Sequence, residues 1–469
     1  MASEFTYLFF DDQRLFGRGG LVRDYTAPEP VATYEDPAFS IDYGFGHAFR
    51  LSDGRVRLLY HGQKPDGTEA NFAAISDDGL HFAPEDTTGV LQLKDRIAPH
   101  EFLPAVPGEE IANIFDDPYA PASQRYKMLH TLLHHDRLFV EGRVFTSPDL
   151  LHWTRLESDG MWNNGCEPIT GTFYNQHHRC YTIIRRPSWG ERRVGVSETH
   201  DFQHFSPLEL ALQTDSLDAP LDEFYGMPSF AYAGMYIGFA DIFTNNVSSR
   251  SAKFCPGAIY PQLCYSFDGR HWQRSLRKSF LKEYHGQDAM FWCTSLVTEA
   301  SGDLLLYVVE SKQAHGYGFT AAQGGRVDIY RIKKDRFIAL QTENGGTGVL
   351  TTRQLVWNGG PLKVNLRAAT ATVALLDEAG RPIPGFDHQD CSLFSGDDTA
   401  WVPTFRGGST DQLIGRVIVA EVRLTDGAVW SLRGDCMPLM NTAAQRYLKF
   451  GPEHIFFDPA FDLEDKQNG

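Results

Sequence analysis

The chain has 469 residues, which is too many for one ordinary hydrophobic core, so we expect two domains or one large repeat domain with an appendage. Aromatic residues make up 13% of the chain, and 43 glycines and 25 prolines favour many short strands joined by turns. The formal charge of -17 excludes a polyanion-binding surface of clustered basic residues, so nucleic acid is not an expected partner.

The N-terminal segment does not have the basic start and apolar stretch of a secretion signal, because Glu4, Asp11 and Asp12 interrupt its hydrophobic residues. No run of about eighteen apolar residues predicts a membrane span. The 7 cysteines form no CxxC pair, which argues against a disulfide framework and against a zinc site. We therefore expect a reducing cytoplasm, with a mature secreted form left open.

A short turn motif, Ser-x-Asp-(Gly)-x-His-aromatic, recurs along the chain. Its copies are SDDGLHF at 76–82, SPDLLHW at 147–153, SFDGRHW at 266–272 and a longer variant, SETHDFQHF, at 197–205. In each copy Ser ends a strand, Asp bonds the turn backbone and the aromatic residue anchors the next strand. The histidines of the three clearest copies, His81, His152 and His271, are interpreted as packing residues of outer hairpins and not as a metal set.

An alternating strand rich in Tyr or Val precedes each copy, and a fifth unit without the turn ends near Ile332. This pattern predicts an all-β protein with a five-bladed β-propeller over 1–335, in which 1–29 is an N-terminal segment. The strands of 336–450 lack the turn motif and predict a C-terminal β-sandwich. The acidic stretch 451–469 is interpreted as a tail.

The innermost strands of a propeller converge on one axial funnel, so acidic residues that open them can meet although they are distant in the sequence. Three carboxylates followed by proline stand out: Asp36 in YEDPAFS, Asp117 in FDDPYAP and Glu167 in NNGCEPITGTFY. Two carboxyl groups, one protonated and one ionised, suffice to cleave an acetal.

In the order and context of these three motifs, the chain resembles the five-bladed propeller glycosidases of glycoside hydrolase families 32 and 43. The resemblance implies a nucleophile or base at Asp36, a residue at Asp117 that tunes the acid and binds sugar, and a general acid at Glu167. It covers most of residues 30 to 335, and the predicted sandwich is similar to the one appended to many fructosidases. The chain lacks the motifs WMNDPNG, RDP and WECP, and its third motif reads Cys-Glu-Pro.

Glu223, in DEFYGMPSF, competes with Glu167 for the role of the acid, and Glu101, Glu35 and Asp42 remain alternatives for the funnel. Aromatic and basic residues near the same strands are expected to hold the sugar. They are Trp162, Arg185, Tyr225, Trp292 and His315. We expect no metal ligands and no required cofactor, and an axial Ca²⁺ ion has no support in the sequence.

The predicted function is hydrolysis of a terminal, furanosidic glycosidic bond, as in a fructan or arabinan. One alternative is a glycoside phosphorylase or transglycosylase on the same fold, with Arg185, Arg186, Arg192 and Arg193 available for phosphate. Another is a non-catalytic propeller that binds glycans. A glycan or glycoside is the expected partner, no membrane partner is expected, and a homo-oligomer remains open.

Overall fold

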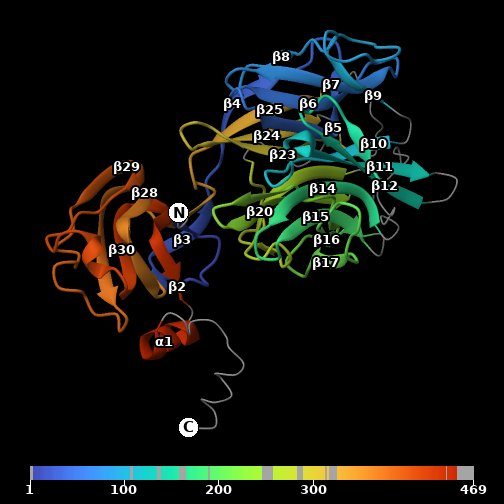
Figure 1. Ribbon diagram of the computed structural model, residues 1–469. Coiled ribbons are helices and arrows are strands. Elements are labelled where there is room, and N and C mark those ends of the chain that lie inside the picture. Colours follow the sequence, from blue (N-terminus) through green and yellow to red (C-terminus); the bar gives the residue numbers. More distant parts are fainter. Residues whose placement is uncertain are drawn as a thin grey trace, which may run out of the picture. The chain divides into compact units, whose positions relative to one another are not determined.

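The computed structural model describes residues 4–105, 109–134, 139–157, 165–187, 191–245, 257–281, 289–311, 314–315, 325–439 and 441–451. These residues are nearly all in strands and turns, which confirms the prediction of an all-β protein. The chain forms two compact units, one of residues Ala27–Lys333 and one of Met1–Thr26 with Lys334–Gly469 (Figure 1).

The larger unit is built from small antiparallel sheets that follow one another along the chain. The first contains β5 (Ser40–Arg50), β6 (Val56–Gln63), β7 (Glu69–Ser76) and β8 (Ala83–Pro84), with β9 (Glu101–Pro104) on β7. The second contains β10 (Glu109–Asp116), β11 (Tyr126–His134), β12 (Phe139–Ser147) and β13 (Thr154–Leu156), with a 3-10 turn at Ala122–Gln124. The third contains β14 (Gly165–Asn175), β15 (Cys180–Pro187), β16 (Val194–Thr199) and β17 (Glu209–Leu212).

The remaining strands of this unit form two further groups joined by a single parallel pair, Ile259 with Met290. In the first group β18 (Asp222–Phe224) and β19 (Ser229–Tyr232) both pair with β20 (Met235–Asn245), followed by β21 (Gly257–Ser266) and β22 (Gln273–Arg274). The second group contains β23 (Met290–Thr298), β24 (Leu304–Ser311), β25 (Arg326–Ile332) and β4 (Glu29–Tyr34).

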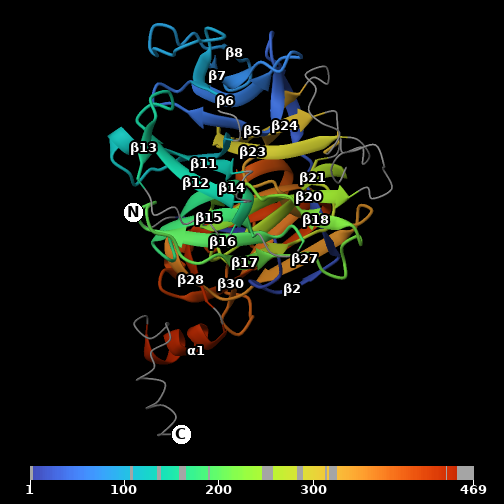
Figure 2. The same ribbon diagram turned by 90° about the vertical axis from the view of Figure 1, so that its right-hand side faces the viewer.

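These sheets close into a ring, as expected for a β-propeller. The first strands of neighbouring groups pack together where β5 lies against β23 (Figure 2) and against β10, β10 against β14, and β14 against β19. The fourth and fifth groups meet through β21 and β23. The ring is sealed where β4, from the start of the unit, pairs with β25 from its end, and Thr33 donates a 2.7 Å hydrogen bond to Asp328 there. We call β5, β10, β14, β18 with β19, and β23 the inner strands, and the edge of the ring where they begin the starting edge.

The repeated turn motif lies at the opposite edge. Each turn connects the third and fourth strands of its sheet. In an antiparallel sheet the third strand runs in the same direction as the first, so the turn lies at the edge where the inner strand ends. In each turn the aspartate accepts hydrogen bonds from the backbone and from the histidine three residues later, at 2.7 Å for His81 and His152, 2.8 Å for His204 and 2.6 Å for His271. We call this edge the turn edge. The side chains of His81, His152 and His271 are 83%, 52% and 85% exposed, so they bond within their own turns and do not pack in a core as the sequence analysis expected.

The smaller unit contains one continuous eight-stranded sheet. It is built on the long strands β28 (Leu355–Asp377) and β30 (Val417–Pro438), with β26 (Ile338–Thr342), β27 (Thr347–Thr352) and β29 (Phe394–Trp401). Leu355 pairs with both Ile418 and Pro438, near the two ends of β30, so the sheet curls back on itself around a core that contains Trp357. The strand pairing therefore shows one curled sheet. The sequence analysis predicted a sandwich of two sheets, and the pairing does not separate the strands into two.

The N-terminal strands belong to this smaller unit. Strand β1 (Phe5–Leu8) pairs with β30, β2 (Leu15–Gly19) with β27, and β3 (Leu21–Tyr25) with β26. The sequence analysis assigned 1–29 to the propeller, which follows it in the chain. The strands that pair with these residues lie more than three hundred residues away, and no local sequence pattern predicts such a pairing. Helix α1 (Asn441–Phe450), which was not predicted, follows β30. Among the described residues, no helix is both long and apolar enough to span a membrane.

Candidate functional site

Each inner strand has an irregularity in its pairing with the next strand of its sheet. The register shifts lie between Ile41 and Gly46 in β5, Ile111 and Asn113 in β10, Cys166 and Ile169 in β14, and Cys293 and Ser295 in β23. In the remaining group, residues 225–228 separate β18 from β19. Bulges of this kind redirect side chains and are frequent beside binding and active sites. The irregular pairing therefore indicates that a candidate site lies along the inner strands.

Glu223 lies at the start of β18, on the starting edge. Arg192 donates a 2.7 Å hydrogen bond to its carboxylate, and Asn245, at the end of the neighbouring strand β20, donates another of 3.0 Å. Burial raises the pKa of Glu223. The bonds from Asn245 and Arg192 lower it by more than burial raises it, so the pKa lies below its usual value. Glu223 is therefore an ionised carboxylate at neutral pH, with its side chain 19% exposed.

Tyr225, two residues further on, is surrounded by cationic and aromatic groups from three sheets. Arg186, from the end of β15, lies over its ring at 5.0 Å, and Arg192 lies 5.9 Å from the ring centre and 4.9 Å from that of Phe243. The ring of His315, which follows β24, is 5.3 Å from Tyr225. We call Glu223, Tyr225, Arg186, Arg192 and His315 the starting-edge cluster.

A carboxyl group is buried directly behind this cluster. The backbone of Asp241, in β20, is bonded to those of Tyr225 and Gly226. Its side chain is fully buried, and neither oxygen has a hydrogen-bond partner among the described residues, so burial raises its pKa well above the ordinary value. Burial therefore favours the protonated, neutral form of Asp241. The sequence analysis missed it, although one charged residue in the otherwise apolar strand MYIGFADIF is a visible signal.

The backbone of Glu167 lies at the start of β14, opposite the end of β15. Cys166 pairs with Arg186 and Ile169 with Arg185, so Glu167 and Pro168 are the extra residues of the bulge. Glu167 therefore comes to the same edge as Arg186 of the cluster. Its side chain and all of Trp162 lie outside the described residues, so the structure places neither group.

Asp36 lies just before β5, on the starting edge, and its partners belong to the first sheet and its loops. Its carboxylate accepts backbone bonds from Ala38 at 2.7 Å and Phe39 at 2.9 Å, a 2.8 Å bond from His100, and a bond from the Tyr60 hydroxyl. The side chain has no exposed surface. Burial raises the pKa of Asp36, but the bonds from His100 and Tyr60 lower it below the ordinary value. The carboxylate is ionised as expected, yet protein groups occupy its bonding positions.

Asp117 lies at the other end of its strand. It follows β10 directly and is therefore on the turn edge, whereas Glu223 opens β18 on the starting edge. Its carboxylate accepts a 2.9 Å bond from Lys127 and a 3.1 Å bond from Tyr181, and its side chain is 1% exposed. The structure does not bring Asp117 to Glu223. The residues that open β10 are Glu109 and Glu110, which the sequence analysis did not consider.

The other candidates lie in different settings. Trp292 is 3% exposed and packs in the core between sheets, in the same cluster as Phe243. Arg185 is buried, and Glu101 accepts a 2.7 Å bond from the backbone of Ile97 in its own loop. Of the sugar-binding residues expected from the sequence, the structure brings together Tyr225 and His315. Asn245 was missed, because it ends an ordinary strand and carries no local signal.

Comparison with known proteins yields likeness only at the level of structure. No protein-family model matches the sequence. No curated protein matches it either. Solved structures that resemble it include propeller-fold glycoside hydrolases.

A glycosyl hydrolase from Bacteroides ovatus is 18% identical, with a TM-score of 0.44, over 69% of this chain and 96% of that one. A GH32 beta-fructofuranosidase from Bombyx mori is 11% identical, with a TM-score of 0.39, over 85% and 93%. A beta-1,2-mannobiose phosphorylase from Listeria innocua is 12% identical, with a TM-score of 0.40, over 71% and 97%. Likeness this distant carries nothing about activity or substrate, since one fold serves many functions.

Proposed function

We propose that this protein is a glycoside hydrolase that cleaves a terminal glycosidic bond at the starting edge of the propeller. The observation that carries the proposal is the starting-edge cluster, in which an ionised carboxylate, Glu223, lies two residues from an aromatic ring, Tyr225, that is flanked by Arg186, Arg192 and His315. Sugars are held by aromatic faces and by fixed hydrogen-bond donors, and acetal cleavage requires an ionised carboxylate.

Glu223 and Glu167 take different roles in this proposal. A general acid must be protonated before it reacts, and the lowered pKa of Glu223 makes it unsuited to that role. Glu223 is therefore the carboxylate that stabilises or attacks the oxocarbenium-like centre. Glu167, whose backbone lies at the same edge, is the acid. Asp36, which the resemblance implies as nucleophile or base, acts in this proposal as a positioning residue that holds the segment leading into β5.

The substrate to test first is a furanoside at the non-reducing end of a fructan or arabinan, because the motifs around Asp36, Asp117 and Glu167 resemble those of enzymes for such sugars. A panel of aryl furanosides and aryl pyranosides, assayed with the full-length protein, distinguishes this sugar class from others.

The experiment compares E223Q and E167Q with D222N on the best substrate of that panel. Asp222 is the neighbour of Glu223 in β18, and successive side chains of a strand point to opposite faces, so D222N is a matched control. We expect E223Q and E167Q to lose at least about a hundredfold in kcat, and D222N to keep most of it. Full activity in both glutamine variants contradicts the proposal, as does binding of the sugar without any turnover.

A second candidate, phosphorolysis, is favoured by the positive charge of the starting-edge cluster. Arg186 and Arg192 lie on the same tyrosine ring, and His315 is on its edge, which is a donor set that suits phosphate. Initial rates with and without inorganic phosphate separate the two reactions. A phosphorylase requires phosphate and releases a sugar phosphate, whereas the hydrolase proposed here turns over at the same rate without it.

A further inference from the structure

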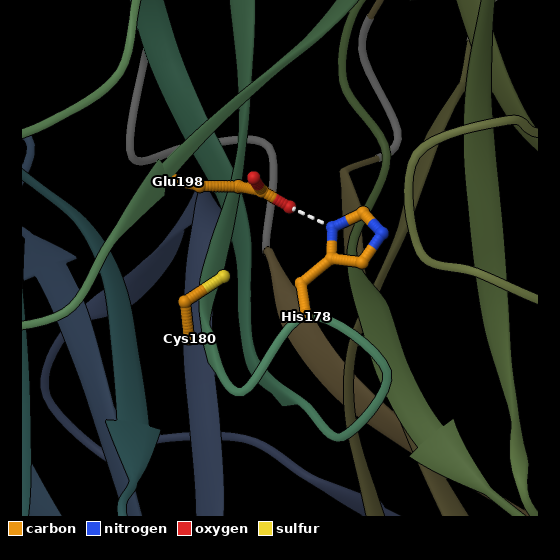
Figure 3. Close-up of side chains that lie close together, drawn as sticks. All are labelled: His178, Cys180 and Glu198. Carbon is orange, nitrogen blue, oxygen red and sulfur yellow. Dashed lines mark hydrogen bonds and ion pairs between the residues drawn. The ribbon is translucent and has the colours of Figure 1, made fainter.

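Three side chains with metal-binding atoms lie close together in the third sheet, at the turn edge. His178 is in the turn between β14 and β15, Cys180 is the first residue of β15, and Glu198 is in β16 (Figure 3). One ligand atom from each lies within 4.8 Å of the others, and His178 Nδ1 is 2.6 Å from Glu198 Oε1. This group is separate from the starting-edge cluster, because β14 begins at one edge of the ring and ends at the other.

The backbone fixes the positions of all three side chains. The side-chain oxygen of Asn175 accepts bonds from the backbone of His177 at 3.1 Å and of His178 at 3.2 Å. Asn175 is fully buried and donates to Thr182 and to the Asp268 carbonyl, so the turn is anchored. Glu198 pairs with Thr182, two residues from Cys180, which puts Glu198 and Cys180 on the same face of the sheet. Arg179, between the two hairpin ligands, has a positive φ of 56°, which completes the reversal.

The Glu198 carboxylate lies between the two other groups. His178 Nδ1 is 2.6 Å from it, and Arg270 is 3.8 Å from it and also pairs with Glu209. Cys180 is 3% exposed, whereas the side chains of His178 and Glu198 are 30% and 19% exposed, so an ion can reach the group from solvent. A divalent cation at this position neutralises the carboxylate and the thiolate that forms on binding.

We propose that His178, Cys180 and Glu198 bind a zinc ion. Imidazole nitrogen, thiolate sulfur and carboxylate oxygen are the atoms that Zn²⁺ accepts, and three protein ligands leave a fourth, tetrahedral position for water. On binding, the Cys180 thiol loses its proton to solvent as the sulfur-zinc bond forms, and no electron is transferred. The two negative ligands balance the charge of the ion.

In this proposal the ion ties the hairpin of β14 and β15 to β16, and a water molecule completes its coordination. The site departs from the sequence prediction of no metal ligands. That prediction rested on the absence of a CxxC pair, whereas these ligands come from a turn and from a strand that pairs beside it. The zinc proposal does not depend on the proposed glycoside cleavage, so each of the two proposals is tested independently.

The test is a metal titration of the full-length protein after treatment with a chelator. Wild type is expected to bind one equivalent of Co²⁺ with the absorption of a cobalt-thiolate bond, and Zn²⁺ is expected to displace it. C180S should lose this absorption, and H178A should bind at least about tenfold more weakly. H177A, in the same turn, is the matched control and should bind as wild type does. Zn²⁺ should raise the melting temperature of wild type and of H177A equally, that of H178A by less, and that of C180S not at all.

Two results overturn the proposal. One is the absence of cobalt-thiolate absorption in wild type, and the other is an equal rise in melting temperature with Zn²⁺ in wild type and C180S. Circular dichroism of the metal-free variants checks their folding. If C180S does not fold, E198Q takes its place, and unchanged Co²⁺ affinity in E198Q contradicts the site.

Discussion

The two edges of the propeller use the same residue types for opposite purposes. On the turn edge each histidine bonds to an aspartate three residues before it, as His152 does with Asp149 at 2.7 Å, and the pair closes a turn. On the starting edge Glu223, Arg192 and His315 come from different sheets and gather around Tyr225. The short repeated motif therefore has a structural role here, whereas residues that ring closure brings together form the candidate site.

The largest expected difference between the two edges is in catalysis. E223Q should lower kcat by at least about a hundredfold, because the neutral amide cannot stabilise a developing positive charge. On the turn edge, D117N should leave the kcat of the folded protein within about threefold of wild type. Steady-state kinetics on an aryl glycoside measures both. A loss of activity in D117N that matches E223Q means that the two edges are not functionally distinct.

D117N should instead reduce stability. Lys127 donates to Asp117 with both side chains almost fully buried, at 6% and 1% exposure. Removing one partner of a buried ion pair leaves the other charge uncompensated, which costs about 3 kcal/mol. Urea unfolding at neutral pH gives the free energy of unfolding. A change below about 0.5 kcal/mol shows that the pair is not a stabilising element of the turn edge.

A third prediction concerns pH and a carboxyl group on the starting-edge side of the last sheet. Burial and a hydrogen bond with Asp328 raise the pKa of Glu310 to about 7, although Arg326 lowers it. The folded protein therefore holds this proton more tightly than the unfolded chain. The stabilisation is fully present below the ordinary pKa of about 4.5 and is lost as the pH rises through about 7.

We expect this group to make the free energy of unfolding fall by up to about 2 kcal/mol between pH 5 and pH 8, after allowance for solvent screening. E310Q should lose that component, and E299Q, at a half-buried ion pair of the same sheet, should keep it. Urea unfolding of the three proteins at both pH values measures the difference. Equal pH dependence in E310Q and wild type contradicts the assignment to Glu310.

The smallest effect concerns the repeated turns. Asp149 accepts bonds from the backbone of Leu151 at 3.0 Å and His152 at 2.9 Å, so D149A should cost about 1 kcal/mol of stability. H152A should cost less than about 0.5 kcal/mol, because its side chain is 52% exposed. A larger loss for H152A than for D149A indicates that the histidine has a role outside its turn.

Much of the propeller could be predicted from the sequence, because its signals are local. The turn motif and the alternating strands before it predicted the successive antiparallel sheets. In the structure each turn lies in the hairpin between the third and fourth strands of its sheet. In the longest variant the turn begins at Thr199 rather than Ser197, since the Thr199 hydroxyl takes the place of the serine. The pairing of β1, β2 and β3 with the smaller unit could not be predicted, because it joins segments from opposite ends of the chain.

The site was predicted in part for the same reason. Glu223 and Tyr225 were proposed from residue type and from their place at the start of the fourth blade, and His315 from its place after the second strand of the fifth blade. The structure brings the three residues together. Asp117 was chosen as a carboxylate followed by proline in the second blade. Asp-Pro also opens turns, and only the structure shows that β10 ends before it. Asn245 becomes visible only through the pairing of β18 and β20, which no short motif encodes, whereas Asp241 has a local signal as the one charged residue of an apolar strand.

The most direct test of the central claim, that the starting-edge cluster binds the sugar of a glycoside substrate, is a crystal structure of E223Q soaked with the best substrate of the panel. The account predicts a sugar ring against Tyr225, with its anomeric carbon next to residue 223 and near Glu167. A sugar bound at the turn edge or on the smaller unit, with the starting-edge cluster unchanged, contradicts it.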